Sequence, residues 1–314
     1  MVVTDGAGSG AAVTDVLDVL GGTGNIALGS GAMGIALTTG TDNVAIGENA
    51  GDALTSGSDN TFVGDNAGGA TTTAANNTAV GSAALLVNST GAANTAVGTN
   101  ALDANTTASY NAALGFDALT ANTTGASNTA VGSYALDANT TGAYNPAVGS
   151  SALGGNTTAD NNTAVGLQAL YTNTTGAGNT AVGKDALEAN TTASNNTAIG
   201  LDALTSATTG GYNTALARQA LYSNTTGTYN TAAGSSALYT NTTGGDNVAI
   251  GADALLDATT GNRNTALGKS AGANLTTGDD NTALGRAALF TATTISDTVA
   301  VGKNALYSMT TGAG

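Results

Sequence analysis

A fixed repeat of 17 residues runs through most of this chain and limits what the chain can fold into. Residues 128–144 show the unit, which reads N-T-A-V-G-x-x-A-L-x-x-N-T-T-G-x-x and begins again at Asn145. Its first glycine recurs every 17 residues from Gly47 to Gly302, with Ala217 in the one substituted position, and the step from Gly29 to Gly47 is 18 residues. Such a period is typical of a repeat architecture, in which each unit packs only against its neighbours.

Seventeen residues are too few for a pair of helices with their turns, but they are enough for one coil of a parallel β-solenoid. With the glycine counted as position 0, the segment +13 to +16 (Asn, Thr, Ala, Val) predicts one strand. The segment +3 to +9 predicts a second strand, and the glycines at 0 and +10 predict the corners. We therefore predict an all-β fold, a single parallel β-solenoid (β-roll) of about 17 coils over residues 25–314. Residues 1–24 do not fit the period, which predicts either an N-terminal cap or a disordered lead-in.

Alternation along a strand separates Thr at +14 and the aliphatic residue at +16 from the alanine at +15. Because +16 is Val, Ile or Leu in nearly all repeats, we predict that +14 and +16 face the inside of the coil with Leu at +4. The alanines then form an outer ladder that suits close packing between chains. Since one coil encloses only a few modest side chains, a single chain would be marginally stable, and we predict a homotrimer. The residues predicted to pack between chains are Ala79, Ala96, Ala113, Ala130, Ala164, Ala181 and Ala198.

Charged residues from Asp42 onward occupy only positions +1, +2, +5, +6, +11 and +12. In an in-register stack, identical positions lie about 4.8 Å apart, so charges are expected at corners rather than in ladders. Asn at +7 and +13 is predicted to form stacked amide ladders. Three residues depart from the pattern: Ala217 would cost about 1 kcal/mol at a positive φ, Pro146 removes a ladder donor, and Phe62 interrupts the alanine row.

Composition excludes several classes of function. Six Lys and Arg against 21 Asp and Glu give a net charge of −15, which repels nucleic acid and anionic lipid headgroups. The chain has no Cys and no His, so it lacks disulfides and the commonest general base and metal ligand. The sequence contains no run of about 18 apolar residues, so it predicts no transmembrane helix. The N-terminus does not resemble a secretory signal. We predict no catalytic residues, no cofactor and no metal site, and hence no enzyme.

Two stretches with the sequence D-N-V-A-I-G, residues 42–47 and 246–251, resemble the NSVAIG motif in the head repeats of YadA-like trimeric autotransporter adhesins. The longer unit is similar to repeats in bacterial surface proteins and phage tail fibres that often carry a C-terminal intramolecular chaperone. Over roughly residues 25–314, the resemblance implies a left-handed parallel β-roll, three chains around one axis and a role in attachment. The 17-residue period is longer than the unit of YadA heads, and no stalk, anchor or chaperone domain of these families is recognisable.

Two sets of surface residues are candidates for contacts. Tyr at the +12 corner would stack on sugars or a receptor, or else cover neighbouring coils; these residues are Tyr110, Tyr144, Tyr212 and Tyr229. The Asn-Thr-Thr triplets match the N-glycosylation pattern, although Asn and Thr also suit ladders and turns, which we favour. The candidate glycosylation residues are Asn105, Asn122, Asn139, Asn156, Asn173, Asn190, Asn224 and Asn241.

Other chemistry is less well supported. The pair Asp279 and Asp280 would suit glycoside hydrolysis if the two acids lined a groove, but scattered acids more often serve solubility. No Ca²⁺-binding loop pattern is present. Ice binding needs a flat outward array of Thr, whereas Thr at +14 is predicted to face inward.

We therefore predict a structural attachment protein, the shaft or head of a trimeric surface adhesin or phage-type fibre. It would be extracellular, on a cell surface or virion, and its partners would be its own copies and a cell-surface or glycan receptor. The alternatives are an extracellular filament that polymerises head to tail through open solenoid ends and, further behind, an ice-binding protein.

Overall fold

The computed structural model describes residues 24–34 and 37–310, and the predicted cap or lead-in lies almost wholly outside them. Within these ranges the chain is all-β and forms a parallel β-solenoid with a 17-residue period, as predicted. It divides into two compact units, Met1–Tyr144 and Asn145–Gly314. The prediction that residues 25–314 form one continuous array stays a prediction, and so does the left-handed coil.

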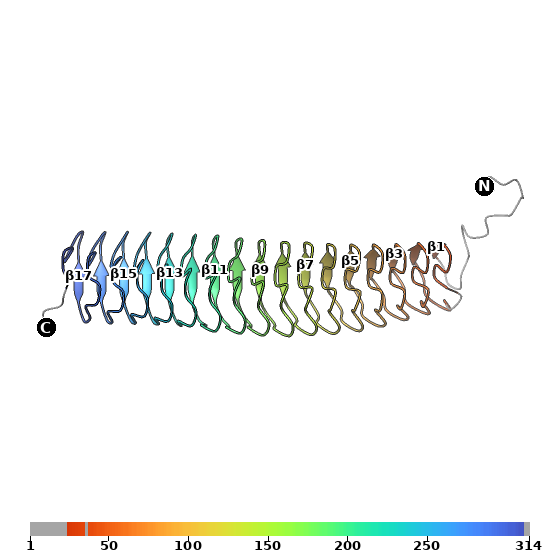
Figure 1. Cartoon of the computed structure of the whole chain (residues 1–314). Helices are drawn as coiled ribbons and strands as arrows, with labels where there is room; N and C mark the ends of the chain where they lie inside the picture. The colour runs from red at the N-terminus through yellow and green to blue at the C-terminus, as the bar shows by residue number, and fades with distance from the viewer. Residues whose placement is uncertain (1–23, 35–36, 311–314) are drawn as a thin grey trace, which may run out of the picture. The chain divides into compact units, whose positions relative to one another are not determined.

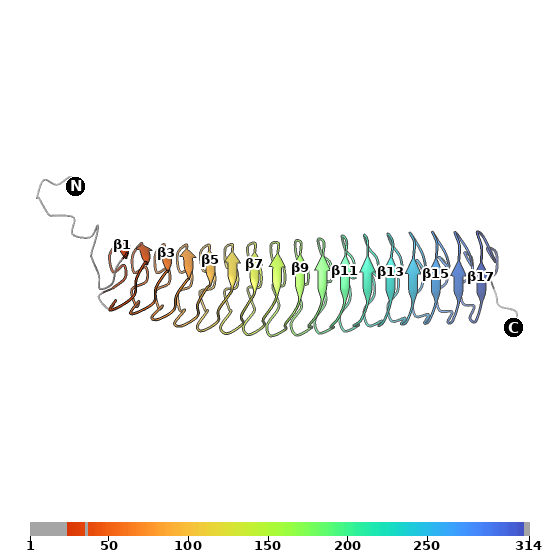
Figure 2. The same ribbon diagram turned by 180° about the vertical axis from the view of Figure 1, so that it is seen from behind.

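Each repeat contributes one strand of three residues, at positions +14 to +16. Within each unit the strands lie side by side and point the same way, as Figures 1 and 2 show from opposite sides. Consecutive strands pair in parallel and in register, so that Thr180 lies opposite Thr197. The first unit contains β1 (Ile26–Leu28), β2 (Val44–Ile46), β3 (Thr61–Val63), β4 (Thr78–Val80), β5 (Thr95–Val97), β6 (Ala112–Leu114) and β7 (Thr129–Val131). The second contains β8 (Pro146–Val148), β9 (Thr163–Val165), β10 (Thr180–Val182), β11 (Thr197–Ile199), β12 (Thr214–Leu216), β13 (Thr231–Ala233), β14 (Val248–Ile250), β15 (Thr265–Leu267), β16 (Thr282–Leu284) and β17 (Val299–Val301).

The second strand predicted at +3 to +9 is wrong, because this segment forms turns and bends. Its backbone is left-handed at +2 and +4, as at Asn100 (φ 56°) and Leu102 (φ 55°), and a strand cannot contain such residues. The turns are nevertheless bonded to each other: the Thr106 N–H donates to the Thr123 carbonyl at 3.1 Å. The +3 to +9 segments of successive turns, which form the second arm of each coil, therefore stack through backbone hydrogen bonds although they are not extended.

The two faces of the strand are the reverse of the sequence prediction. The middle residue of every strand is buried, and it is alanine everywhere except at Phe62. The flanking residues at +14 and +16 are half-buried or exposed. Leu at +4 is inside, as predicted, with the alanines at +3 and +15. The prediction that the alanine ladder packs between chains is therefore wrong, because these seven side chains are fully buried within their own chain: Ala79, Ala96, Ala113, Ala130, Ala164, Ala181 and Ala198.

The narrow interior explains the reversal. Leu at +4 and two asparagines already share the cross-section of each coil, so only a methyl group fits at +15. Phe62 is the exception, and it shows that the space inside the coil is limited. Its large ring is fully buried at +15 where two turns have Gly51 and Gly68 at +4 in place of Leu. A Cβ added at these glycines would lie 2.8 Å and 2.5 Å from the Phe62 ring. Phe62 is thus a core residue whose volume replaces that of two leucines.

The asparagine ladders are confirmed at both predicted positions. At +13, the Asn60 side chain accepts from the Asn77 N–H at 3.0 Å and donates to the Ala74 carbonyl at 2.9 Å. At +7, Asn122 Nδ2 donates to Asn105 Oδ1 at 3.0 Å and the Asn139 amide donates to Asn122 in turn. These amides are fully buried, and their mutual hydrogen bonds offset the cost of removing them from water.

The other two departures behave as predicted. Ala217 has a φ of 111°, in the positive region that the corner glycines adopt. Pro146 opens β8, and the pairing of β8 with β9 includes only Ala147 with Ala164 and Val148 with Val165. The missing N–H of Pro146 thus removes the first hydrogen bond of that ladder.

Candidate interaction surfaces

The outer surface of the strands forms an uncharged strip in each unit, here called the strand face and defined by positions +14 and +16 of β1–β17. Every turn presents one residue at each position, and none of them is charged. The aliphatic residues at +16 are well exposed, with 38 % of Val165 and 44 % of Leu267 accessible. The residues of this row that are most exposed are Leu28, Ile46, Val80, Val97, Leu114, Val148, Val165, Ile199, Leu216, Ile250, Leu267, Leu284 and Val301.

The size and regularity of the strand face distinguish it from scattered surface hydrophobics. Each row adds about 4.8 Å along the stack and about 10 Å across it, or roughly 50 Å². The ten rows of the second unit thus present roughly 500 Å², in which an aliphatic row at +16 runs beside a row at +14 that is mostly Thr. Because side chains at +14 and +16 recur at the strand spacing, only a surface with the same spacing can match the strand face over its length.

The four tyrosines singled out at +12 all lie on the surface. Tyr110 and Tyr144 are 71 % and 62 % exposed. Tyr212 and Tyr229, on successive turns, stack on each other with ring centroids 5.0 Å apart and planes 11° apart. Each ring of the second pair is therefore partly covered by the other, whereas Tyr110 and Tyr144 are more exposed. A receptor contact by these tyrosines stays a prediction.

The predicted glycosylation sites are not accessible in the folded chain. Asn105 Nδ2 donates to Asn88 Oδ1 and to the Ala108 carbonyl, at 2.9 and 3.0 Å. N-glycosylation would replace one of these hydrogens with a sugar in a fully occupied interior. The glycosylation prediction is therefore wrong for the folded chain, and the ladder interpretation holds for all eight residues, which are fully buried: Asn105, Asn122, Asn139, Asn156, Asn173, Asn190, Asn224 and Asn241.

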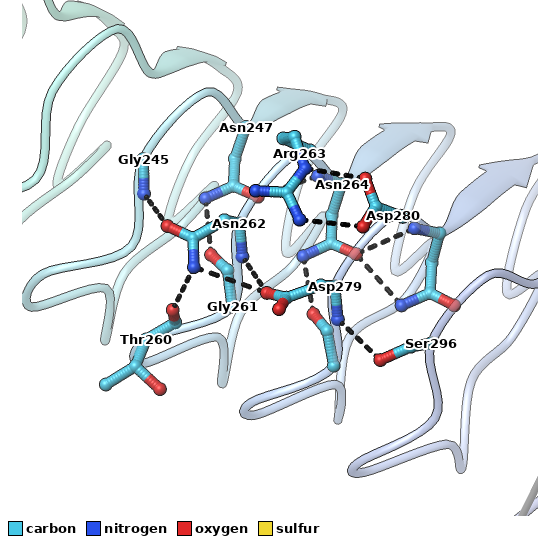
Figure 3. Close-up of polar contacts among 12 residues, drawn as sticks. Gly245, Asn247, Thr260, Gly261, Asn262, Arg263, Asn264, Asp279, Asp280 and Ser296 are labelled. Carbon is cyan, nitrogen blue, oxygen red and sulfur yellow. Dashed lines mark hydrogen bonds and ion pairs between the residues drawn. The ribbon is translucent and has the colours of Figure 1, made fainter.

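The carboxylates of Asp279 and Asp280 are engaged in contacts between turns (Figure 3). Asp279 accepts the Asn262 N–H at 2.7 Å, and its own N–H donates to Ser296 at 3.0 Å. Asp280 accepts two hydrogen bonds from Arg263, both at 2.7 Å, and this guanidinium lowers the pKa of the carboxyl. This arrangement ties neighbouring corners together, and the lowered pKa of Asp280 does not suit general-acid catalysis.

Two acids in the first unit have raised pKa values. Burial raises the pKa of Asp103 and of Asp137, and the nearby charge of Asp117 adds to both shifts. Asp103 also has a buried carboxylate oxygen without a hydrogen-bond partner. The three acids lie at corners of successive repeats, so their repulsion is a consequence of the stacking rather than of a shared cleft.

Residues 24–34 and 37–310 present neither a metal-ligand cluster nor a membrane-spanning helix. No group of three or more Asp, Glu, His or Cys side chains there is placed to hold a metal ion. That part of the chain contains no helix long and apolar enough to cross a membrane.

The fold and its surfaces define a β-solenoid repeat protein in which every turn contributes one row to the strand face. Comparison with models of known protein families gives no match, and comparison with curated proteins gives no relative. The functional assignment therefore depends on the surfaces themselves.

The sequence prediction missed the strand face because it assigned +14 and +16 to the interior. The co-occurrence of Phe62 with Gly51 and Gly68 was a signal that +15 faces +4.

Proposed function

We propose that this chain is a non-enzymatic structural protein that associates side by side with its own copies and serves in attachment. It would form the shaft or head of a homotrimeric surface adhesin or phage-type fibre outside the cell. The observation that carries the proposal is the strand face, which is uncharged, repeats in register and exposes a row of aliphatic side chains at +16. It takes the place of the alanine ladder, which is enclosed within the chain.

The occupant that fits the strand face is another copy of the same chain. A second copy has the same spacing between rows, so aliphatic side chains at +16 can interdigitate along each unit. The ten rows of the second unit present roughly 500 Å² per chain, so two such faces would together bury roughly 1,000 Å², about the minimum area of a biological interface. Three strand faces around a common axis would leave every charged corner in water.

The mass in solution tests this proposal directly. We expect light scattering to give about three times the chain mass of 29.8 kDa, and negative-stain images to show short rods. Replacing Val165 and Ile199 with Lys places two charges in the strand face and should dissociate the trimer. The matched control replaces Thr158 and Thr192, exposed +9 residues of the same two turns. It should remain trimeric, with unchanged circular dichroism.

A monomeric wild-type chain would rule out side-by-side association. Long threads would instead favour head-to-tail polymerisation. Equal masses for the strand-face variant and its control would show that the strand face is not the interface.

One observation also favours ice binding as a second candidate. Thr at +14 lies on the outer face, as at Thr129 and Thr265, which are exposed. The predicted inward position of Thr at +14, which argued against an ice-binding array, is therefore wrong. Freezing-point hysteresis that is present in the wild type, lost in the Val165 and Ile199 variant and kept in its control would favour this candidate over the trimer, because one face cannot serve both.

A further inference from the structure

Three cations stand on successive turns near the end of the second unit. Lys269, Arg286 and Lys303 occupy position +1, directly after the corner glycines that follow β15, β16 and β17. In register, their backbones are spaced by about 4.8 Å. They account for half of the six Lys and Arg in a chain of net charge −15. Among the described residues, Lys184 and Arg263 form ion pairs, whereas these three have no carboxylate partner.

The same corner is free of acidic residues. Residues 269–274, 286–291 and 303–308, which hold the +1 to +6 positions of these turns, contain no Asp or Glu. Like charges on neighbouring rows repel each other, and no side chain within these segments neutralises them. A bound anion would relieve this repulsion.

A hollow of about 340 Å³ lies beside the cations, within the size range of small-molecule sites. Lys269 and Arg286 line it together with Phe290, Asn304 and Tyr307. Phe290 and Tyr307 stack in parallel, with ring centroids 5.0 Å and planes 5° apart.

The preceding turn explains why the row of rings stops there. It carries the small residue Ala273 at +5, the position that Phe290 and Tyr307 occupy on their own turns, so no third ring continues the row. The hollow therefore combines two cations, an aromatic wall, an amide and, from Ser270, a hydroxyl.

We propose that this hollow binds an anionic saccharide, a sugar that carries a carboxylate or a sulfate. The planar guanidinium of Arg286 suits two parallel hydrogen bonds to such a group, and the two lysines add charge on either side. The aromatic wall suits the apolar C–H face of a sugar ring, and Ser270 and Asn304 suit its hydroxyl groups.

The surroundings favour a short saccharide over nucleic acid. A nucleic acid strand carries a charge every 3.4 Å or so and needs a long basic track. Here the basic track is three residues long, and Asp253 and Asp257 lie at +2 and +6 of the turn before it. The net charge of −15 repels an extended polyanion, whereas a single acidic sugar meets mainly the local cations.

Isothermal titration on the full 314-residue chain tests this site. The probes are a uronic acid disaccharide, its neutral carboxyl-reduced analogue, a sulfated disaccharide and a short single-stranded oligonucleotide. The test variants are Arg286→Gln and Tyr307→Ala. The matched control is Arg218→Gln, because Arg218 is also at +1 without a carboxylate partner and its turn carries Tyr222, stacked on Tyr239 at 5.1 Å. The neighbouring turns of Arg218 carry Leu201 and Ser235 at +1, so the row of three cations distinguishes the two places.

We expect the wild type to bind an acidic disaccharide and not the neutral one, with binding that weakens as salt increases. Arg286→Gln should weaken binding about tenfold or more, Tyr307→Ala should also weaken it, and Arg218→Gln should leave it unchanged. The tighter of the two acidic probes identifies the group that the site prefers. The proposal is overturned if no saccharide binds, if the neutral analogue binds equally well, if Arg286→Gln has no effect, or if the oligonucleotide binds more tightly.

The site would supply a ligand class for the proposed attachment function, and its biological meaning rests on that function. The two can fail separately because binding is measured per chain. A trimer without saccharide binding would reject the site alone, and a monomer that binds the acidic sugar would reject the trimer alone.

Discussion

Ala217 is the one residue at position 0 that is not glycine, and replacing it with glycine should stabilise the chain. Its φ is 111°, whereas Gly200 and Gly234 on the neighbouring turns have φ values of 140° and 146°. A Cβ added at Gly234 would lie 2.5 Å from the carbonyl of Gly251, so this corner closely approaches the backbone of the next turn. The methyl group of Ala217 meets the equivalent backbone, which accounts for its displaced φ.

The expected gain is the difference between two opposing effects. A non-glycine residue held in a sparsely populated backbone region costs about 1–3 kcal/mol. Glycine gives the unfolded chain more freedom than alanine, which costs about 0.4–1 kcal/mol on folding. We therefore expect Ala217→Gly to increase the free energy of unfolding by about 1 kcal/mol, equivalent to about 1.5 °C in melting temperature for a chain of 314 residues.

Equilibrium urea denaturation at a fixed protein concentration, followed by circular dichroism, measures this effect. The matched control makes the same chemical change at Ala215, in the middle of β12, where the side chain is buried. Ala215→Gly removes a buried methyl group and should lower stability by about 1–2 kcal/mol. The reasoning is refuted if both variants are destabilised to the same extent, because chain entropy would then outweigh the strain at Ala217.

Three further predictions follow from the interior. Asn122→Ala breaks two hydrogen bonds of the buried +7 ladder and should lower the free energy of unfolding, measured by urea denaturation, by about 2–4 kcal/mol. The control Thr124→Ala, on the surface of the same turn, should change it by less than about 0.5 kcal/mol. Because the pKa of Asp103 is raised on folding, its contribution to stability is complete below the unfolded pKa and is lost as pH rises through the folded pKa. Asp103→Asn should therefore raise the melting temperature at pH 7 and leave it unchanged near pH 3; the same increase at both pH values would contradict this. Phe62→Ala should cost about 3–5 kcal/mol. Adding Gly68→Leu should recover part of that loss, since Leu occupies +4 opposite Ala in most other turns. Purely additive effects in a double-mutant cycle would argue against contact between the two positions.

The sequence was sufficient to predict the features that depend on local rules. The 17-residue period, the position of the strand and the corner at the glycine follow from residue spacing and backbone preference. The asparagine ladders and the corner charges follow from what a parallel stack accepts at identical positions. Stacking amplifies each of these signals, because a residue that is unfavourable once is unfavourable at every turn.

The direction of the side chains was not predictable by the same rules. Alternation shows that Thr, Ala and Val occupy two faces, but hydrophobicity places Val inside, and the narrow interior requires Ala. The decisive quantity is the distance between the two arms of a coil, and that distance depends on how the +3 to +9 segment folds. Left-handed residues such as Leu102 make this segment a turn. Nothing in the propensity of leucine predicts that conformation.

The reversal of faces also changes what an isolated chain needs. With the alanines outside, association would have been needed to complete a thin core, and a monomer would have been unstable. With alanine, leucine and asparagine inside, each coil completes its own core, and the apolar residues that remain outside are available for a partner. Association through the strand face would then add stability to chains that are already folded, so Lys at Val165 and Ile199 should produce a folded monomer. An unfolded product would mean that the interior and the interface cannot be separated in this way.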